Sequence, residues 1–179
     1  MNKETEQYIK SKIRNVKDFP KKGIMFKDIT TLIQDPTALN TTIFEMKKIC
    51  SGKKIDVIVG IESRGFIFGS ILAHELGVGF VPVRKRGKLP AAKMDVEYEK
   101  EYGMDAVEIH KDSIRKGENV LIVDDLLATA GTLLATTKLV EKTGGNIIGI
   151  LVLIELSFLN GRKKLSKYNI YSMVKYGKD

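Results

Sequence analysis

Two adjacent aspartates, Asp124 and Asp125, follow the apolar run 120–123 and precede a run of small and hydroxyl residues. An unpaired carboxylate is costly to bury, so we expect this pair at the exit of a buried strand, facing water or a ligand. Carboxylate oxygens there could accept hydrogen bonds from a ribose diol or help to hold a metal attached to a substrate. The alternative is that the pair only caps the following turn.

The next five residues of interest read ATAGT and lead into a predicted helix that starts near Thr132. Main-chain N–H groups at such a turn and at a helix N-terminus form a cradle for phosphate, and small side chains let the anion approach closely. The hydroxyl groups of Thr129 and Thr132 could add donors. A site for a sugar phosphate needs both features side by side: carboxylates that bind the sugar hydroxyls and main-chain amides that bind the phosphate. The candidate residues of the cradle are Ala128, Thr129, Ala130, Gly131 and Thr132.

Basic residues lie in two further places. Ser63, Arg64 and Gly65 follow the predicted strand 55–61, where Arg64 supplies fixed positive charge and Gly65 permits a tight loop. The cluster RKRGK at 84–88 has three interpretations: a solvated charge run, a surface for nucleic acid, or part of an anion site.

Residues 84–106 are charged, contain glycine and proline, and show little sustained periodicity, so we predict a long loop or a hairpin. A loop of this length in a compact domain is usually functional or disordered. Glu97, Glu99 and Glu101 in this segment are all candidates, by their chemistry, for moving a proton.

The elements that position these residues alternate between strand and helix. Asp35 followed by Pro36 predicts an N-cap and a helix that stops at Gly52. Strands buried on both faces that alternate with helices indicate one domain with an open, mostly parallel sheet, in which ligands bind beyond the carboxyl ends of the strands. The strands are predicted at 55–61, 79–83, 120–125, 147–156 and 171–176, and the other helices at 3–14, 65–76 and 132–142.

The composition narrows the class of protein. The 179 residues are enough for one well-buried core, and a formal net charge of +8 favours an anionic partner unless the surplus lysines only keep the surface soluble. The single cysteine, Cys50, cannot form an internal disulfide and is predicted to be a core residue. We expect a cytoplasmic protein, because no apolar run approaches the length of about 18 residues that a membrane span needs and the polar N-terminus is not a secretory signal.

Five segments together resemble the type I phosphoribosyltransferases, and in particular the adenine-specific branch of that family. The central one, VLIVDDLLATAGT at 120–132, is similar to the motif with which the family binds phosphoribosyl diphosphate. The resemblance covers roughly residues 5–177. The other four segments are FPKKGIMFKDIT at 19–30, GIESRGFIFG at 60–69, VPVRKRGKLP at 81–90 and EYGMDAVEIH at 101–110.

The resemblance implies a fold and a reaction. The fold is an open, mostly parallel twisted sheet flanked by helices, with a small N-terminal hood over about 1–34 and a mobile lid loop over about 84–106. The reaction joins adenine to 5-phosphoribosyl 1-diphosphate, giving AMP and diphosphate in purine salvage. Mg²⁺ is expected to arrive on the diphosphate rather than on a site held by the protein. The family further implies a homodimer, and we expect neither a nucleic acid nor a membrane as partner.

The resemblance also implies roles for individual residues. Glu101 matches the family's general acid or base at the purine N7, and Tyr102 helps to close the lid. The residues implied for the diphosphate are Ser63, Arg64, Gly65, Arg84, Lys85, Lys88 and Tyr102. Those implied for adenine are Met25, Phe26, Lys27, Leu126 and Ala128, with the Phe26 ring as a stacking face.

Three positions depart from the commonest family pattern. Ala130 stands where glycine is frequent, so the loop is strained if that site needs a positive φ. Lys27 stands where arginine is frequent, and Glu62 where alanine or aspartate occurs. Two alternatives stay open: an enzyme for hypoxanthine, guanine or xanthine, and a regulator that binds phosphoribosyl diphosphate and nucleic acid. The latter class usually carries an added DNA-binding segment, for which residues 1–18 are short.

Overall fold

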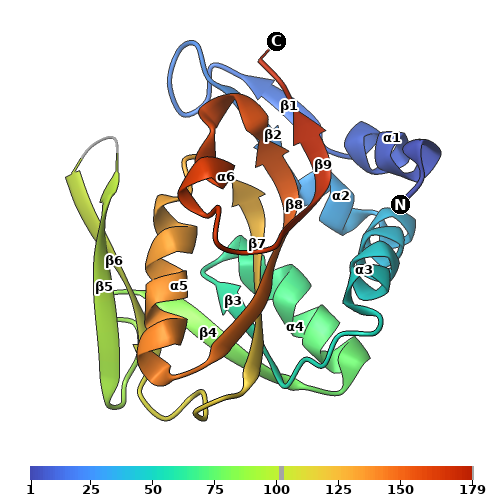
Figure 1. Cartoon of the computed structure of the whole chain (residues 1–179). Helices are drawn as coiled ribbons and strands as arrows, with labels where there is room; N and C mark the ends of the chain where they lie inside the picture. Colours follow the sequence, from blue (N-terminus) through green and yellow to red (C-terminus); the bar gives the residue numbers. More distant parts are fainter. Residues whose placement is uncertain (101–102, 179) are drawn as a thin grey trace.

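The computed structural model describes residues 1–100 and 103–178. Within them a seven-stranded sheet runs in the order β5-β6-β4-β3-β7-β8-β9. Strands β4, β3, β7, β8 and β9 are parallel to one another, whereas β5 and β6 form an antiparallel hairpin at one edge (Figure 1). The mostly parallel sheet flanked by helices is confirmed. The strands are β3 (Val57–Ile61), β4 (Gly79–Lys85), β5 (Lys93–Lys100), β6 (Gly103–His110), β7 (Asn119–Leu127), β8 (Asn146–Leu156) and β9 (Ile170–Tyr176).

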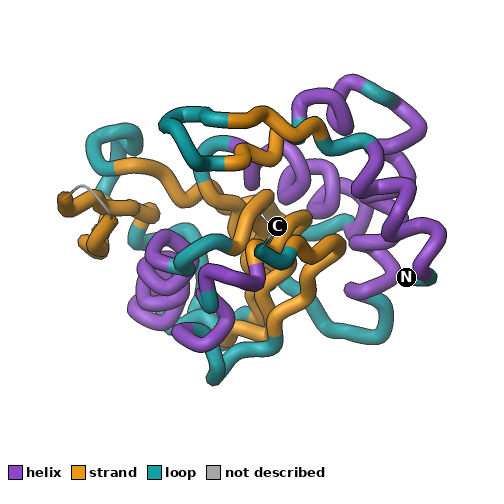
Figure 2. The backbone as a smooth tube through the Cα atoms, turned by 90° about the horizontal axis from the view of Figure 1, so that it is seen from above, coloured by secondary structure: helices purple, strands orange, loops and turns teal. Residues whose placement is uncertain are grey.

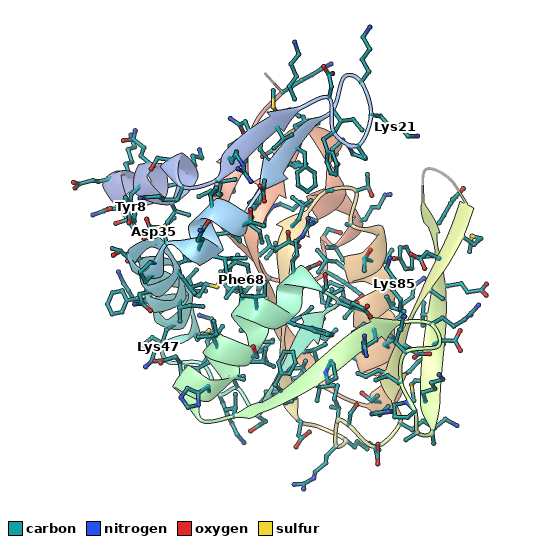
Figure 3. All side chains as sticks on the ribbon, turned by 180° about the vertical axis from the view of Figure 1, so that it is seen from behind. Tyr8, Lys21, Asp35, Lys47, Phe68 and Lys85 are labelled. Carbon is teal, nitrogen blue, oxygen red and sulfur yellow. The ribbon has the colours of Figure 1, made fainter. Side chains whose placement is uncertain are left out.

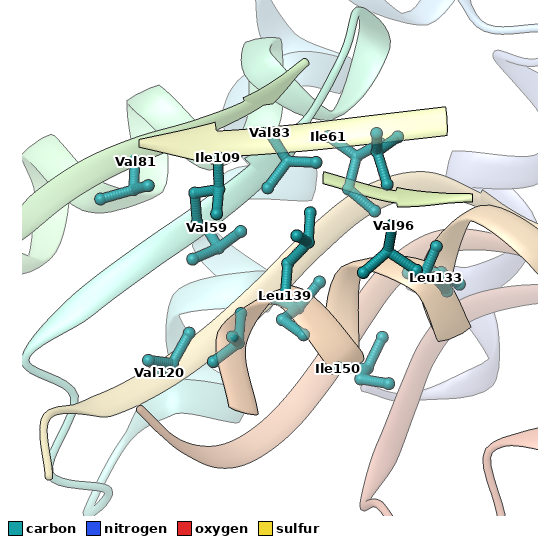
Figure 4. Packing of buried hydrophobic residues seen from close by; sticks show 14 of the residues in the cluster. Val59, Ile61, Val81, Val83, Val96, Ile109, Val120, Leu133, Leu139 and Ile150 are labelled. Carbon is teal, nitrogen blue, oxygen red and sulfur yellow. The ribbon is translucent and has the colours of Figure 1, made fainter. Parts of the chain in front are cut away.

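Helices cover both faces of the parallel strands, which is why those strands are apolar throughout. On one face α5 (Gly131–Thr143) packs against β5, β6, β7 and β8, and its Leu133 and Leu139 belong to the same buried cluster as Val59 and Ile61 of β3 (Figure 4). The other face is covered by α3 (Pro36–Cys50) and α4 (Arg64–Leu76), with α1 (Lys3–Ser11) packed beside α3 and β9. None of the described helices is long and apolar enough to cross a membrane.

The predicted helix boundaries follow local chemistry. The Asp35 carboxylate accepts hydrogen bonds from the Thr37 N–H at 2.9 Å and the Ala38 N–H at 3.1 Å, and so caps α3 as expected. Helix α4 ends at Gly77, whose φ of 67° is the left-handed conformation that glycine adopts without strain. Cys50, predicted to be a core residue, is buried at the end of α3.

The N-terminal region contains short elements that the pattern did not predict. The predicted helix 3–14 stops at Ser11, and β1 (Arg14–Lys17) pairs antiparallel with β2 (Met25–Asp28) before α2 (Thr30–Gln34). The Arg14 guanidinium Nε donates to the Asp28 carboxylate at 3.0 Å across this pair. Four-residue strands with few buried side chains carry no readable periodicity, so tertiary contacts decide them.

Within the segment 84–106, the described residues 93–100 and 103–106 belong to the antiparallel hairpin of β5 and β6, which was one of the two predictions for this segment. Val96 on β5 is buried and Tyr98 is partly buried against the same core, whereas Glu97 and Glu99 are exposed. The hairpin stands at one side of the molecule, where β6 pairs with the end of β4 and α5 packs against β5 and β6 (Figures 1 and 2). The alternation of apolar and charged residues in 93–100 is the sequence signal that favours a strand here over a loop. The remaining short elements are η1 (Ser157–Leu159) and α6 (Gly161–Lys164).

Candidate active site

A pocket of about 830 Å³ opens at the carboxyl ends of β3, β4 and β7. Its walls include Asp124, Asp125 and the whole segment 128–132, with Ser63 and Arg64 across from them. The pocket therefore brings together the acids, the small-residue loop and part of the basic groups that were singled out in the sequence.

The two aspartates lie within β7 and not at its exit. The strand continues through Leu127, and the exposed fractions of Asp124 and Asp125 are only 9% and 5%. The expectation that the pair lies at the exit of the strand was wrong, because the apolar pair that follows them, Leu126 and Leu127, extends the strand. They still form part of the pocket wall.

Each carboxylate has a distinct partner. Asp125 Oδ2 lies 2.7 Å from the Arg64 guanidinium Nε, and Asp124 Oδ1 accepts the Asp125 N–H at 2.9 Å. Burial raises the pKa of Asp124 well above its usual value, and the adjacent Asp125 charge adds to the rise. Burial also raises the pKa of Asp125, while the charge of Arg64 opposes that rise. Hydroxyl donors from a ligand would stabilise the charged forms that burial disfavours.

The small-residue loop ends in a strained residue. Ala130 precedes α5 with φ 68° and ψ 9°, so the strain expected of alanine at a positive φ is present. This conformation costs a non-glycine residue about 1–2 kcal/mol. Within the residues that the structure describes, no side chain caps the first turn of α5. The main-chain N–H groups of that turn are therefore open to an anion in the pocket.

Gly161 supports this loop from behind, a role that sequence reasoning missed. A Cβ atom at Gly161 would lie 2.1 Å from the Ala128 carbonyl oxygen and 3.1 Å from the Ala130 nitrogen. The following residue, Arg162, donates from Nε and Nη2 to the Glu155 carboxylate at 2.9 and 2.6 Å, which fixes the segment against β8. The sequence signal was only a glycine beside an arginine.

We expect Gly161→Ala to displace the loop 128–130 and to weaken the binding of a phosphorylated substrate by about 10-fold or more, with a stability loss of about 1–3 kcal/mol from overpacking. The clash falls on backbone atoms, which cannot rotate away. The Michaelis constant and urea unfolding measure the two effects. Gly177→Ala is the matched control, since a Cβ there meets nothing within 4 Å. An unchanged Michaelis constant in Gly161→Ala would contradict the supporting role.

The residues predicted to bind the diphosphate do not all line the pocket. Ser63, Arg64, Lys85 and Lys88 line the pocket, and Lys85 lies at the end of β4 next to the hairpin (Figure 3). Among the described residues Arg84 is not part of the lining, because its Nε donates to Glu62 Oε2 at 3.1 Å.

Gly65, the second residue of α4, lies just behind the lining and lets the start of that helix approach the acids. A Cβ atom there would lie 2.8 Å from the Val123 carbonyl oxygen and 2.9 Å from Asp124 Oδ1. Any larger residue would therefore push the first turn of α4 away from the carboxylate pair.

The hairpin reaches the pocket through Tyr98 and Glu99. Both lie against the start of α5: a Cβ atom at Gly131 would be 3.2 Å from the Tyr98 ring and 3.3 Å from the Glu99 carbonyl oxygen. Glu97 instead forms an ion pair with Arg86 at 2.9 Å. The predictions for Glu101 and Tyr102 concern positions outside the described residues.

The residues predicted to bind adenine are only partly brought together. Leu126 and Ala128 line the pocket, joined by Leu159, which sequence reasoning missed because η1 is far along the chain. The Phe26 ring centroid lies 5.5 Å from the Arg64 guanidinium carbon, so Phe26 borders a lining residue. Met25 and Lys27 are not in the lining among the described residues. Lys27 Nζ instead donates to Asn15 at 2.9 Å and lies 4.1 Å from the Tyr176 ring centroid.

In the described part of the chain, no group of three or more His, Cys, Asp or Glu residues is placed to hold a metal ion.

Comparison with known proteins gives one consistent picture. Residues 32–177 match the model of the phosphoribosyl transferase domain. The adenine phosphoribosyltransferase of Acetivibrio thermocellus is 59% identical over 94% of this chain and 99% of its own length.

Solved structures agree with that picture. The adenine phosphoribosyltransferase of Thermoanaerobacter pseudethanolicus has a TM-score of 0.93 at 55% identity, covering 96% of this chain and 99% of its own. The enzyme of Saccharomyces cerevisiae, complexed with an imino-altritol bisphosphate and adenine, has a TM-score of 0.90 at 42% identity, covering 95% and 98%.

Proposed function

This chain belongs to the adenine phosphoribosyltransferase family, and we propose that the pocket described above is where it joins adenine to 5-phosphoribosyl 1-diphosphate. In this reaction the bond from the anomeric carbon to the diphosphate oxygen breaks, a bond from that carbon to adenine N9 forms, and the base loses one proton. The products are AMP and diphosphate. The observation that carries the proposal is the acid pair and the open α5 amides on one pocket wall.

The sugar and its phosphate occupy that wall. The phosphate lies among the main-chain N–H groups of 128–132, with the hydroxyl groups of Thr129 and Thr132 as further donors. The ribose hydroxyls donate to Asp124 and Asp125. This assignment is supported by the depth of the acids and by the ion pair that holds Asp125 beside Arg64.

The diphosphate lies at the basic end of the pocket. Positive charge there comes from Arg64, Lys85 and Lys88, and a hydroxyl group comes from Ser63. Gly65 keeps the first turn of α4 close to the acids. Positive charge at this end stabilises the leaving group as the anomeric carbon develops oxocarbenium character. Mg²⁺ enters as part of the substrate, bound to its diphosphate, which also reduces repulsion from the two aspartates.

Adenine lies between the apolar residues Leu126, Ala128 and Leu159 and the Phe26 ring. Met25 and Lys27 belong to this end only if β1 and β2 shift toward the pocket when the base binds. Glu101 takes the proton at the purine N7, and Tyr102 closes the hairpin over the diphosphate. The hood over 1–34 and the hairpin together exclude water.

The cellular assignments follow from the reaction. We infer that the enzyme acts in purine salvage in the cytoplasm and forms a homodimer, with adenine and phosphoribosyl diphosphate as its small-molecule partners. The adenine-bound structure of the yeast relative supports the choice of base.

Comparing bases tests the proposal. The purified chain is given adenine, hypoxanthine, guanine or xanthine at equal concentration, with phosphoribosyl diphosphate and Mg²⁺, and nucleotide formation is measured. We expect AMP to be the main product. Absence of turnover with all four bases would overturn the activity, and a preference for hypoxanthine would overturn the assignment of the apolar base site.

A further inference from the structure

A fully buried carboxylate holds the turn between β4 and β5. Glu108 on β6 has an exposed fraction of 0%, and it accepts three consecutive main-chain N–H groups. Its Oε1 accepts from Lys88 at 2.8 Å and Leu89 at 2.6 Å, and its Oε2 accepts from Gly87 at 3.0 Å. One side chain thus holds the main chain of three consecutive residues of the turn.

The Glu108 carboxylate is ionised. Burial alone would raise its pKa, but the N–H groups of Gly87 and Leu89 and the ammonium of Lys93 lower that pKa to about 2. Lys93 Nζ lies 3.1 Å from Glu108 Oε2 and also donates to the Leu89 carbonyl oxygen at 2.9 Å. A buried charge with four donors is stable, and losing it would leave the N–H groups of Gly87 and Leu89 without an acceptor, while the Lys88 N–H would keep the Lys85 carbonyl oxygen at 3.2 Å.

The basic residues of 84–88, in and beside this turn, differ in whether they line the pocket or form ion pairs elsewhere. Arg84 is paired with Glu62, and Arg86 is paired with Asp95 and Glu97, so the charge of both arginines is compensated. Lys85 and Lys88 line the pocket, and neither has a carboxylate within 4.0 Å in the described part of the chain. The two lysines are therefore the basic groups of this segment that line the pocket without an ion pair of their own, although the charge of Lys88 helps to lower the pKa of Glu62.

Both lysines are anchored through their main chains rather than their side chains. The Lys88 N–H donates to Glu108, and the Lys85 N–H donates to Glu62 Oε2 at 2.9 Å. An exposed lysine has many rotamers, so the position of its Cα decides how often its ammonium reaches a given point.

We propose that Glu108 is a positioning residue for the diphosphate end of the pocket, and that it acts by holding the 87–89 turn so that Lys88 faces the bound diphosphate. This inference rests on the proposed function, because it takes the ligand at that end to be a diphosphate. Glu108 itself touches no substrate.

Calorimetric titration with inorganic diphosphate and Mg²⁺ tests the inference without requiring catalysis. We expect Glu108→Gln to raise the Kd for diphosphate by about 10-fold, because an amide cannot accept all three N–H groups and the turn loosens. Glu45→Gln is the matched control. It removes another buried glutamate, exposed by 7% and paired with Lys48 on α3, away from the pocket, and it should leave this Kd within about twofold.

A double-mutant cycle with Lys88→Gln separates positioning from general loosening. If Glu108 acts through Lys88, adding Glu108→Gln to Lys88→Gln changes the Kd little further, whereas independent effects would multiply. Should Glu108→Gln fail to fold, Glu108→Asp keeps the charge but shortens its reach, and the same rise in Kd is expected.

Multiplying effects, or a Kd in Glu108→Gln and Glu108→Asp equal to that of Glu45→Gln, would overturn the inference. Failure of the proposed function looks different, because the unaltered chain would then bind diphosphate and yet form no AMP from adenine.

Discussion

Replacing Asp124 and Asp125 together by asparagine is expected to lower kcat/KM for phosphoribosyl diphosphate by about 1,000-fold, since each lost charge-assisted hydrogen bond to a ribose hydroxyl is worth about 1.5–3 kcal/mol. The two acids form part of the pocket wall, and Asp125 also holds Arg64 at 2.7 Å. Steady-state kinetics with varied phosphoribosyl diphosphate measure the loss. A change smaller than about 10-fold would contradict their role at the sugar.

The same double substitution should not weaken the fold. Burial raises the pKa of both acids, which means that the folded state disfavours their charged forms. Neutral amides remove that penalty, so we expect the free energy of unfolding in urea to stay equal or to rise. Asp56→Asn is the control, because Asp56 accepts the Asn119 N–H at 2.8 Å at the opposite end of the sheet and should leave kcat/KM unchanged.

Substituting Glu101 by leucine is expected to lower kcat by about 100-fold or more while substrate binding stays largely intact. The carboxylate is proposed to take the purine proton as the new bond forms, so its loss affects the transition state more than the ground state. Single-turnover rates together with the Kd for adenine separate these effects.

Glu97→Leu on β5 is the matched control for that substitution. It makes the same chemical change on the same hairpin, but Glu97 is engaged with Arg86 on the exposed side and should leave the rate within about twofold. A Glu101→Leu enzyme with an unaltered rate would remove the acid–base role.

The sheet was predictable because its strands are buried on both faces and its helices carry local caps. Runs such as 120–123 need no partner to be recognised as strand, and Asp35 with Pro36 marks the start of α3 by its own chemistry. The pair β1 and β2 was not predictable, since four-residue strands are stabilised by cross-strand contacts such as Arg14 with Asp28.

The sequence predicted which residues line the pocket together better than it predicted how deeply the acids are buried. The acids and the ATAGT loop carry their own signature, whereas the burial of Asp124 depends on β7 continuing through Leu127. Gly161 and Leu159 reach the pocket region from a segment about 30 residues further along the chain, and only the packing of β8 and α6 brings them there. Sequence spacing carries no record of such long-range contacts.

The contact between Tyr98 and Gly131 makes the hairpin and the first turn of α5 share one surface. If a bound ligand stabilises that turn, it also stabilises the packing of the hairpin on α5. Because the coupling free energy is the same in both directions, the packed hairpin must raise the affinity for the ligand by the same factor. Gly131 thus serves two partners at once: the lack of a side chain leaves room for an anion on one side and for an aromatic ring on the other. A methyl group at position 131 would weaken the binding of the anion and the packing of the Tyr98 ring together.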